Sequence, residues 1–329
     1  MPADLLIAGG GPVGLAAAIE ARLAGLTVEV VEPRAGLIDK ACGEGLMPGA
    51  VPLLERLGVA PQGFPLRGVS YRSSSARADH RFADGHGLGV RRTTLHAALR
   101  ERALDLGATL TEGSVEAIEP GRWTLGCDGL HSTVARLTGL ARPAPASRRR
   151  FGLRQHYAVE PWSDLIEVHW NPVAELYVTP TADGVVGIAA LARRGIGFEQ
   201  ALAASPALAA RVVGLTPATS LRGAGPFRQR TRARTAGRVL LVGDASGYVD
   251  AITGEGLRLG FAQARAAVAA VVAGDASAYE REWTRITRDF RVLTGALALA
   301  ASSPLRAAIV PAAARLPRVF GAAVEHLAR

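Results

Sequence analysis

Hydrophobic residues gather in short runs near both ends of the chain, separated by segments with helical spacing. Residues 4–8 and 27–31 are brief apolar runs, and residues 12–24 between them repeat apolar side chains with the period of a helix. Another apolar run, 239–242, precedes an Ala-rich helical segment at 257–272. Short buried strands that alternate with helices predict an α/β domain, a Rossmann-like parallel sheet covered by helices.

The middle of the chain follows a different pattern. Apolar and polar residues alternate over 151–159, 166–170 and 176–178, and residues 185–191 form an apolar run. Four strands at this close spacing predict an antiparallel sheet. Residues 68–83 also alternate in short segments, which predicts a hairpin.

Helical spacing returns after this sheet. One helix is predicted over 198–213, and residues 277–329 are predicted as helical with breaks at Pro304, Pro311 and Pro317. Because strands of the parallel type lie both before and after the predicted antiparallel sheet, the first domain must be discontinuous. The expected division is a Rossmann-like domain of residues 1–66, 88–146 and 236–275, an inserted antiparallel-sheet domain of residues 67–87 and 147–235, and a C-terminal helical segment of residues 276–329.

The turn after the first predicted strand has the sequence of a dinucleotide-binding loop. Gly9, Gly11 and Gly14 match G-x-G-x-x-G between a strand and a helix. In this motif the first glycine permits the tight turn, the second lets the backbone reach a pyrophosphate, and the third allows close helix–strand packing. Glu32 lies where such proteins place an acceptor for a ribose 2′-hydroxyl. An ordinary glycine turn would leave Glu32 unexplained, so the sequence predicts a dinucleotide site.

The segment that follows residue 242 predicts a second part of a cofactor site. Asp244 comes at the end of the apolar run, and the loop from Gly243 to Gly256 contains four glycines. A lone aspartate at the end of a strand is a good acceptor for a hydroxyl group. A glycine-rich loop that leads into a helix lets backbone N–H groups approach a planar or anionic group closely. We expect this segment to hold the middle of a large cofactor.

Composition narrows the class of protein. The chain has 329 residues, of which 49% are hydrophobic, so it can form two packed domains or one large discontinuous domain. Its net charge is +9, and Lys40 is the only lysine. The arginines are scattered rather than interleaved with aromatic residues, so no nucleic-acid partner is predicted. The one basic run, 148–150, is interpreted as a solvated loop before a strand.

Cysteine and histidine usage indicates neither a disulfide framework nor a metal site. The two cysteines are Cys42 and Cys127, and the seven histidines have no metal-ligand spacing. The first strand begins almost at once, leaving no room for a signal peptide. The most apolar helix carries Arg258 and Arg265 and is short for a bilayer span. We therefore expect a soluble, cytoplasmic protein without a transmembrane segment, for which peripheral membrane contact remains open.

Three motifs in order along the chain resemble those of the para-hydroxybenzoate hydroxylase-like flavoproteins. They are the glycine loop 9–14 with Glu32, the segment 126–132 (Gly-Cys-Asp-Gly-Leu-His-Ser), and Gly243-Asp244 with the later Gly-Glu-Gly at 254–256. This superfamily includes FAD-dependent monooxygenases and geranylgeranyl reductase-like enzymes. The segment 42–48 looks closest to the geranylgeranyl reductase-like branch and to bacterial FAD-dependent oxidoreductases of secondary metabolism.

The resemblance implies FAD as the cofactor and NADPH or NADH as a transient reductant. It implies the first glycine loop at the pyrophosphate, Glu32 at the adenosine ribose, and Asp244 at the ribityl chain. For Asp128 a simple turn aspartate, and for Arg92 a surface arginine at a helix start, are the alternatives. The implied cofactor-binding residues are Gly9, Gly11, Pro12, Val13, Gly14, Glu32, Pro33, Arg34, Arg92, Asp128, Asp244, Gly254, Gly256 and Leu257.

The chain departs from the family pattern in one place. The family has a three-stranded meander before the Asp-Gly motif, but only about fifteen residues separate Thr111 from Cys127 here. This spacing is too short for three strands and two turns. We therefore predict a trimmed Rossmann-like domain in which the meander is missing.

The leading functional interpretation is an FAD-dependent, NAD(P)H-using monooxygenase that hydroxylates an aromatic, phenolic or polyketide-like small molecule with O₂. The candidate residues for its substrate pocket are Arg154, His156, Tyr157 and Tyr177. The alternative is a reductase of C=C bonds in a lipidic prenyl or quinone substrate, with Cys42 and Glu44 as candidate catalytic residues.

Two further possibilities belong to other classes. A halogenase of this superfamily uses an active-site lysine, and this chain has Lys40 alone and lacks a Trp-x-Trp-x-Ile-Pro segment, so that activity is disfavoured. A non-catalytic FAD-binding module is the remaining alternative.

Overall fold

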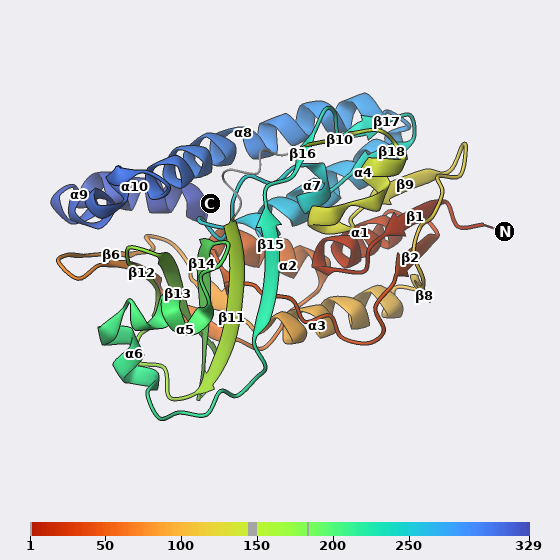
Figure 1. Ribbon diagram of the computed structural model, residues 1–329. Coiled ribbons are helices and arrows are strands. Elements are labelled where there is room, and N and C mark those ends of the chain that lie inside the picture. The colour runs from red at the N-terminus through yellow and green to blue at the C-terminus, as the bar shows by residue number, and fades with distance from the viewer. Residues whose placement is uncertain (1, 144–149, 183) are drawn as a thin grey trace.

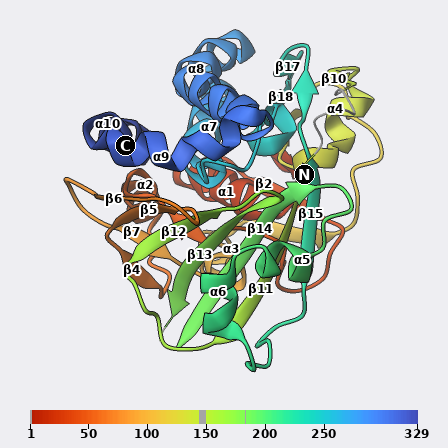
Figure 2. The ribbon, with the colours of Figure 1, turned by 60° about the vertical axis from the view of Figure 1, so that its left-hand side comes forward.

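The computed structural model describes residues 2–143, 150–182 and 184–329. Two large sheets lie side by side, and helices run over one side of both (Figure 1). The sheet that contains the N-terminal strand is covered by long helices, whereas the second sheet lies further from them and carries only short helices on its outer side (Figure 2).

The first sheet has six strands in the order β17-β18-β9-β1-β2-β8. All neighbours in it are parallel except β17, which pairs antiparallel with β18. The central strand β1 lies between strands that come from distant parts of the sequence. The bounds are β1 (Leu5–Ala8), β2 (Val28–Glu32), β8 (Thr109–Glu112), β9 (Trp123–Gly126), β17 (Thr235–Ala236) and β18 (Val239–Leu241).

Helices cover both faces of this sheet, as the alternation of apolar runs and helical segments predicts. On one face α1 (Pro12–Leu23) packs against α3 (Arg92–Asp105) and α7 (Gly256–Ala273). On the other face α4 (Thr133–Leu137) packs against β9, and its core includes Ala8 and Leu241. The predicted Rossmann-like α/β class is confirmed.

The second sheet has seven strands in the order β15-β11-β14-β13-β12-β5-β6. The predicted hairpin at 68–83 forms β5 and β6 and joins the edge of this sheet. Its strand β5 pairs parallel with β12, so the sheet is not wholly antiparallel. The bounds are β5 (Gly68–Arg72), β6 (Arg77–Arg81), β11 (Arg150–Ala158), β12 (Leu165–Trp170), β13 (Ala174–Ala182), β14 (Val185–Arg193) and β15 (Arg222–Phe227).

Short elements connect these layers. They are β3 (Gly45–Leu46), β4 (Phe64–Leu66) and β7 (Gly87–Gly89) of a small third sheet, the pair β10 (Ala141–Arg142) and β16 (Arg230–Thr231), the helix α2 (Val51–Leu57), and the 3₁₀ turns η1 (Pro48–Ala50), η2 (Gly129–His131) and η4 (Gly243–Ser246).

The helix predicted over 198–213 is wrong as a single element. The structure has α5 (Phe198–Ala203) and α6 (Pro206–Val212) instead. Pro206 has no N–H to donate and disfavours helical geometry at the preceding residue, so a helix ends before it. At the first position of α6 the same proline is well tolerated.

The C-terminal segment is helical and bridges the two sheets. The long helix α8 (Ala276–Ala301) packs on α7, while α9 (Ile309–Arg315) and α10 (Pro317–Ala328) pack on β6 (Figure 1). Of the three prolines predicted to break this segment, Pro304 is the first residue of η5 (Pro304–Ala308) and Pro317 is the first residue of α10. The break predicted at Pro311 is wrong, because this proline lies in the first turn of α9, where its missing N–H has no acceptor to lose.

The prediction of a trimmed domain is confirmed. Residues 113–122, between β8 and β9, contain no strand, so the meander of the family is missing here. The domain boundary expected at 146/147 lies outside the described residues, and the proposed division into domains remains a prediction.

The basic run at 148–150 is only partly described. Arg148 and Arg149 lie outside the described residues. Arg150 was expected in a solvated loop, but its side chain is buried and forms ion pairs with Glu175 and with Asp250, the latter at 3.1 Å. The solvated-loop interpretation is therefore wrong for Arg150, because buried carboxylates of β13 and of the loop after η4 compensate its charge.

Within the described ranges, α7 is the one continuous helix long and apolar enough to cross a membrane, and α8 with the residues up to Arg315 meets the same criterion only as a strongly bent pair. About half of the apolar window of α7 is buried, against α1 on one side and α8 on the other. This is the packing of a core helix.

Candidate functional site

A cavity of about 540 Å³ lies between the two large sheets. The carboxyl ends of β1, β2, β8, β9 and β18 line one side of it, and β5, β12, β13 and β14 line the other. The carboxyl end of a parallel sheet is where α/β proteins bind ligands, because the loops there are free to vary while the strands hold them in place.

The turn from β1 to α1 requires two of its glycines. Gly9 has φ +102°, a conformation in which a side chain would be strained, and a Cβ there would lie 2.6 Å from the carbonyl oxygen of Cys127. A Cβ on Gly14 would lie 1.8 Å from the carbonyl oxygen of Gly9. Both glycines therefore permit close backbone packing, as the motif predicts.

Gly11 has a different role in this turn. A Cβ added to Gly11 would meet no atom within 4 Å, and the residue lines the cavity. It is the N-cap of α1, whose first N–H groups have no acceptor within the helix. The N-terminus of α1 therefore offers the cavity a position where an anionic group can accept hydrogen bonds from the backbone.

Glu32 ends β2 at the edge of this cradle. Its Oε2 accepts a hydrogen bond of 2.8 Å from the N–H of Gly10, and its Oε1 accepts one of 2.7 Å from Arg34. Burial opposes ionisation of Glu32, but the hydrogen bond and charge of Arg34, with the N–H of Gly10, hold the pKa of this carboxyl below its usual value. Glu32 is thus an ionised acceptor, as binding to a ribose hydroxyl needs.

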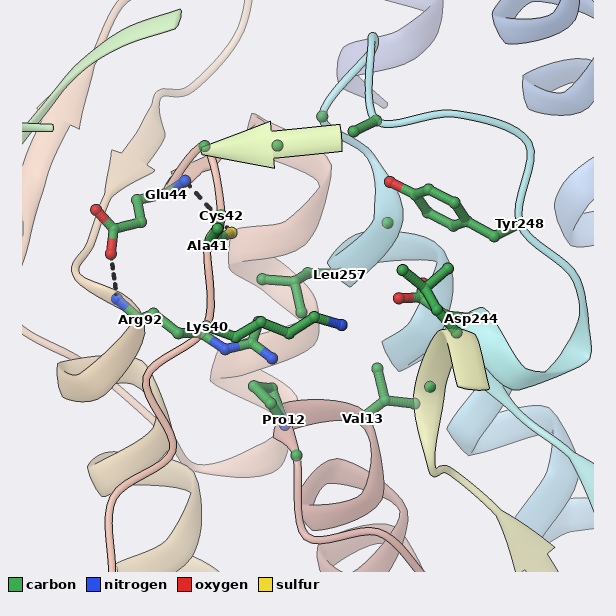
Figure 3. Close-up of a pocket in the computed structure, with 18 of the residues that line it drawn as sticks. Pro12, Val13, Lys40, Ala41, Cys42, Glu44, Arg92, Asp244, Tyr248 and Leu257 are labelled. Carbon is green, nitrogen blue, oxygen red and sulfur yellow. Dashed lines mark hydrogen bonds between the residues drawn. The ribbon is translucent and has the colours of Figure 1, made fainter. Parts of the chain in front are cut away.

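Two basic side chains point into the cofactor side of the cavity. Lys40 and Arg92 lie beside each other between Pro12 and Leu257 (Figure 3), and neither forms an ion pair with the described residues. The backbone N–H of Arg92 donates to Oε1 of Glu44 at 2.8 Å. Lys40 was not among the predicted cofactor residues, although its being the only lysine of an arginine-rich chain was a possible signal.

Asp128 has one oxygen in a structural role and one that is free. Its Oδ2 accepts hydrogen bonds from the backbone N–H groups of Thr133 and Val134, at 2.6 and 3.0 Å, at the start of α4. Its Oδ1 is buried and has no protein partner, and the residue lines the cavity. A turn aspartate and a ligand-binding aspartate are both compatible with this arrangement.

Asp244 follows β18 and lies on the cavity wall opposite Lys40 and Leu257 (Figure 3). The backbone under it is fixed, since the N–H of Gly243 donates to Oε1 of Gln263 in α7 at 2.8 Å. Gly254 and Gly256 line the cavity just before α7, and a Cβ on Gly254 would meet nothing within 4 Å. The structure thus brings the two predicted glycine-rich segments to one cavity.

The loop 39–44 is joined to β11 by a buried polar network. Nε2 of His156 lies 2.6 Å from Oε2 of Glu44. Nδ1 of the same ring lies 2.9 Å from Nη1 of Arg154. Arg154 also forms a short ion pair with Asp39. Glu44 is nearly fully buried and has φ +58°, a strained conformation that this network holds in place. The network fixes the loop that carries Cys42.

Three of the four predicted pocket residues are placed elsewhere. Arg154 and His156 lie beneath the loop 39–44 and do not line the cavity, because Asp39 and Glu44 cover that end of β11. Tyr157 points to the opposite face of the sheet, into the core under α5 and α6. Tyr177 does line the cavity, and its hydroxyl donates to the carbonyl of Ile252 at 2.8 Å.

Both candidate catalytic residues lie at the cavity. Cys42 is half-buried, and its Sγ accepts a hydrogen bond of 3.4 Å from the N–H of Glu44 (Figure 3). Glu44 uses both carboxylate oxygens within the protein, on His156 and on the backbone of Arg92. Their catalytic role remains a proposal.

Glu255, just before α7, gives the structure a pH-dependent element. Its side chain is buried, its Oε1 has no partner and its other oxygen pairs with Arg258. Burial raises the pKa of this carboxyl to about 7. Because the pKa in the folded state is above the ordinary value of 4.5, the protonated form stabilises the fold at low pH, and this stabilisation is lost as the pH rises through about 7.

Replacing Glu255 with glutamine is therefore expected to raise stability at high pH. The variant should be close to wild type at about pH 5 and more stable at about pH 9, by up to roughly 3 kcal/mol. Thermal unfolding at the two pH values measures this difference. Glu282→Gln, which removes an exposed carboxylate of an i,i+3 pair, is the control and should show little change. An equal effect of Glu255→Gln at both pH values would contradict the assignment.

Comparison with known proteins identifies the class. No protein-family model matches the chain. It is 28% identical over 331 residues to a menaquinone reductase of Mycolicibacterium smegmatis, covering 87% of this chain and 80% of the relative. It is 30% identical over 318 residues to the 12-dehydrotetracycline 5-monooxygenase/anhydrotetracycline 6-monooxygenase of Streptomyces rimosus. The match covers 79% of this chain and 61% of the relative. The chain thus spans about three fifths of the length of that curated monooxygenase.

Solved structures of flavin-dependent enzymes share the fold of this chain. OxyS anhydrotetracycline hydroxylase from Streptomyces rimosus matches with a TM-score of 0.68 and 27% identity, covering all of this chain and 75% of that one. The flavin-dependent halogenase CmlS shares the fold with a TM-score of 0.78 at 18% identity, covering 89% and 63%. At that identity the halogenase shows the fold alone.

The chain therefore resembles, in sequence and in fold, the FAD-dependent flavoproteins that include the tetracycline monooxygenases. It is an enzyme, an FAD-dependent oxidoreductase, as the three motifs predict. The cavity fits FAD, because the open N-terminus of α1, the cations Lys40 and Arg92 and the acceptor Glu32 match a negatively charged dinucleotide.

Proposed function

We propose that the protein is an NAD(P)H-using monooxygenase that hydroxylates an aromatic or polyketide-like small molecule with O₂. The observation that carries this proposal is one continuous cavity with two unlike sides. One side has the glycine cradle and charged residues that suit FAD, and the other is the apolar surface of the seven-stranded sheet. The similarity to the tetracycline monooxygenase supports this proposal.

FAD, when bound, supplies the redox chemistry, taking electrons from NADPH or NADH and passing them to O₂. The residues of this chain bind and orient it. The N-terminus of α1 would hold the pyrophosphate, and Asp244 would accept a hydrogen bond from a ribityl hydroxyl. The N-terminus of α7 lines the cavity, and its partial positive charge would favour a negative charge on the bound cofactor. The apolar sheet keeps water away from the reacting atoms.

Replacing Asp244 with alanine is expected to lower FAD retention strongly, because it removes a hydroxyl acceptor from the cavity wall while leaving the Gly243–Gln263 hydrogen bond intact. The flavin absorbance per protein, measured after purification, checks this. Asp289→Ala, at an exposed position on α8, is the matched control. Unchanged flavin content in Asp244→Ala would contradict the role.

A reductase acting on C=C bonds is the second candidate. Cys42 lines the cavity, and the chain covers most of a menaquinone reductase. In that case Cys42 would lie beside the substrate double bond and Glu44 would hold its loop.

One experiment separates these functions. The purified holoprotein is given NADPH and candidate aromatic or prenyl substrates, with and without O₂. Product that forms only with O₂ supports the monooxygenase, and product formed anaerobically supports the reductase. Flavin binding without NAD(P)H consumption for any substrate would support a non-catalytic FAD-binding module. We further propose a cytoplasmic location.

A further inference from the structure

The charged residues of the cavity are gathered on its cofactor side. Among the described residues, its charged lining comes from the ends of β2 and β9, the loop before β3, the start of α3 and the loop after β18. These residues are Glu32, Arg34, Lys40, Glu44, Arg92, Asp128 and Asp244. No strand of the seven-stranded sheet contributes a charged side chain to the described lining.

The sheet side is built from uncharged residues at every second position. The pairing register places Tyr71 opposite Val168, Val168 opposite Tyr177, and Tyr177 opposite Ala189, so their side chains share one face. The lining residues of β5, β12, β13 and β14 on this face are Val69, Tyr71, Ile166, Val168, Tyr177, Thr179, Ala189 and Leu191. Val324 and Leu327 of α10 also line the cavity and add to its apolar surface.

Strands of the seven-stranded sheet, including β11, do contain charged residues, but their charges are compensated away from the cavity. Arg154 pairs with Asp39 beneath the loop 39–44. Glu175 pairs with Arg150 and with Arg306 of η5. None of these side chains lines the cavity, so none is available to neutralise a charged substrate.

Hydroxyl groups are the polar atoms that remain on this face. Thr179 is 1% exposed, lines the cavity, and its Oγ1 has no hydrogen-bond partner. Tyr177 already donates its proton to Ile252, which leaves its oxygen as an acceptor. Burial raises the pKa of Tyr71 to about 12, so this hydroxyl stays protonated and neutral. A buried hydroxyl without a partner costs free energy unless a ligand supplies one.

We propose that the sheet side of the cavity takes a neutral aromatic substrate that presents a hydroxyl or carbonyl group to Thr179, and that it excludes aromatic acids. This proposal rests on the proposed function, since it assigns the substrate of the same site. A carboxylate moved from water into such a surface loses its hydration and gains no cation, and that loss opposes its binding.

The charge preference is tested by calorimetric titration of the holoprotein near neutral pH with two probes of the same ring skeleton. 2-Naphthol is neutral and carries a hydroxyl, whereas 2-naphthoate is an anion. We expect 2-naphthol to bind at least about tenfold more tightly. Equal or tighter binding of 2-naphthoate, or no binding of 2-naphthol, would overturn the proposal.

Thr179 is tested with the near-isosteric variant Thr179→Val. It should weaken 2-naphthol binding several-fold and leave the flavin content unchanged. The control is Thr181→Val, because Thr181 is equally buried with an unpartnered hydroxyl on the same strand but does not line the cavity. Equal affinities for the wild type and Thr179→Val would overturn the role of Thr179.

These outcomes are separate from those that test the reaction. The titration measures binding and requires no turnover. If product forms without O₂ while 2-naphthol is still preferred, the monooxygenase is rejected and the neutral site stands. If product requires O₂ but 2-naphthoate is preferred, the monooxygenase stands and the neutral site is rejected.

Discussion

Replacing Gly14 with alanine is expected to abolish formation of the soluble flavoprotein. The added Cβ would lie 1.8 Å from the backbone carbonyl oxygen of Gly9, and no side-chain movement can relieve a clash with backbone. The helix α1 must then move away from β1, at the centre of the sheet and of the largest hydrophobic core. Soluble yield and flavin absorbance measure the effect.

Gly11→Ala, three residues earlier, is the matched control. Its Cβ would meet no atom within 4 Å, and Gly11 has φ −67°, which suits alanine. This variant should fold with a melting temperature near that of the wild type, yet bind FAD more weakly because the methyl group occupies the open space at the start of α1. A soluble Gly14→Ala protein with normal flavin content would contradict the clash.

The second large effect is expected from the buried network under the loop 39–44. Arg154→Met keeps much of the side-chain volume but removes the cation that contacts Asp39 and His156. Arg154 is fully buried, and breaking a buried ion pair on one side typically costs about 3 kcal/mol or more. Denaturant unfolding followed by tryptophan fluorescence gives the change in free energy of unfolding.

Arg222 provides a control on the same carboxylate. Its Nε contacts Oδ2 of Asp39 at 3.1 Å, but about half of its side chain is exposed. Arg222→Met should therefore cost less than about 1 kcal/mol, as exposed pairs do. Similar costs for both variants would show that burial does not set the strength of this network.

The parts of the fold that depend on local sequence signals could be predicted. The glycine loop, the apolar strands, the helix start at Pro12 and the break at Pro317 are each encoded within a few residues. The missing meander also followed from a count of residues between β8 and β9. The single helix predicted over 198–213 was wrong because the apolar period continues across Pro206. Periodicity alone does not register that proline lacks a backbone N–H donor.

The substrate side of the site could not be predicted in the same way. Alternation correctly places Arg154 and His156 on one face of β11, but it does not show that Asp39 and Glu44, more than a hundred residues earlier, cover them. The role proposed for Thr179 could not be predicted from the sequence either. It depends on the absence of a hydrogen-bond partner for its hydroxyl, which only the folded structure shows. The sequence shows that Lys40 is the only lysine, but it does not show that the loop 39–44 directs this side chain into the cavity.

The position of β18 in the first sheet also determines when the flavin site can exist. This strand pairs with β9 more than a hundred residues earlier, and Asp244 follows it directly. During synthesis, the glycine cradle after β1 is made more than two hundred residues before the opposite wall of the cavity, which follows β18. We therefore expect that a nascent chain retains FAD only once β18 has paired with β9, because only then do both walls of the cavity exist.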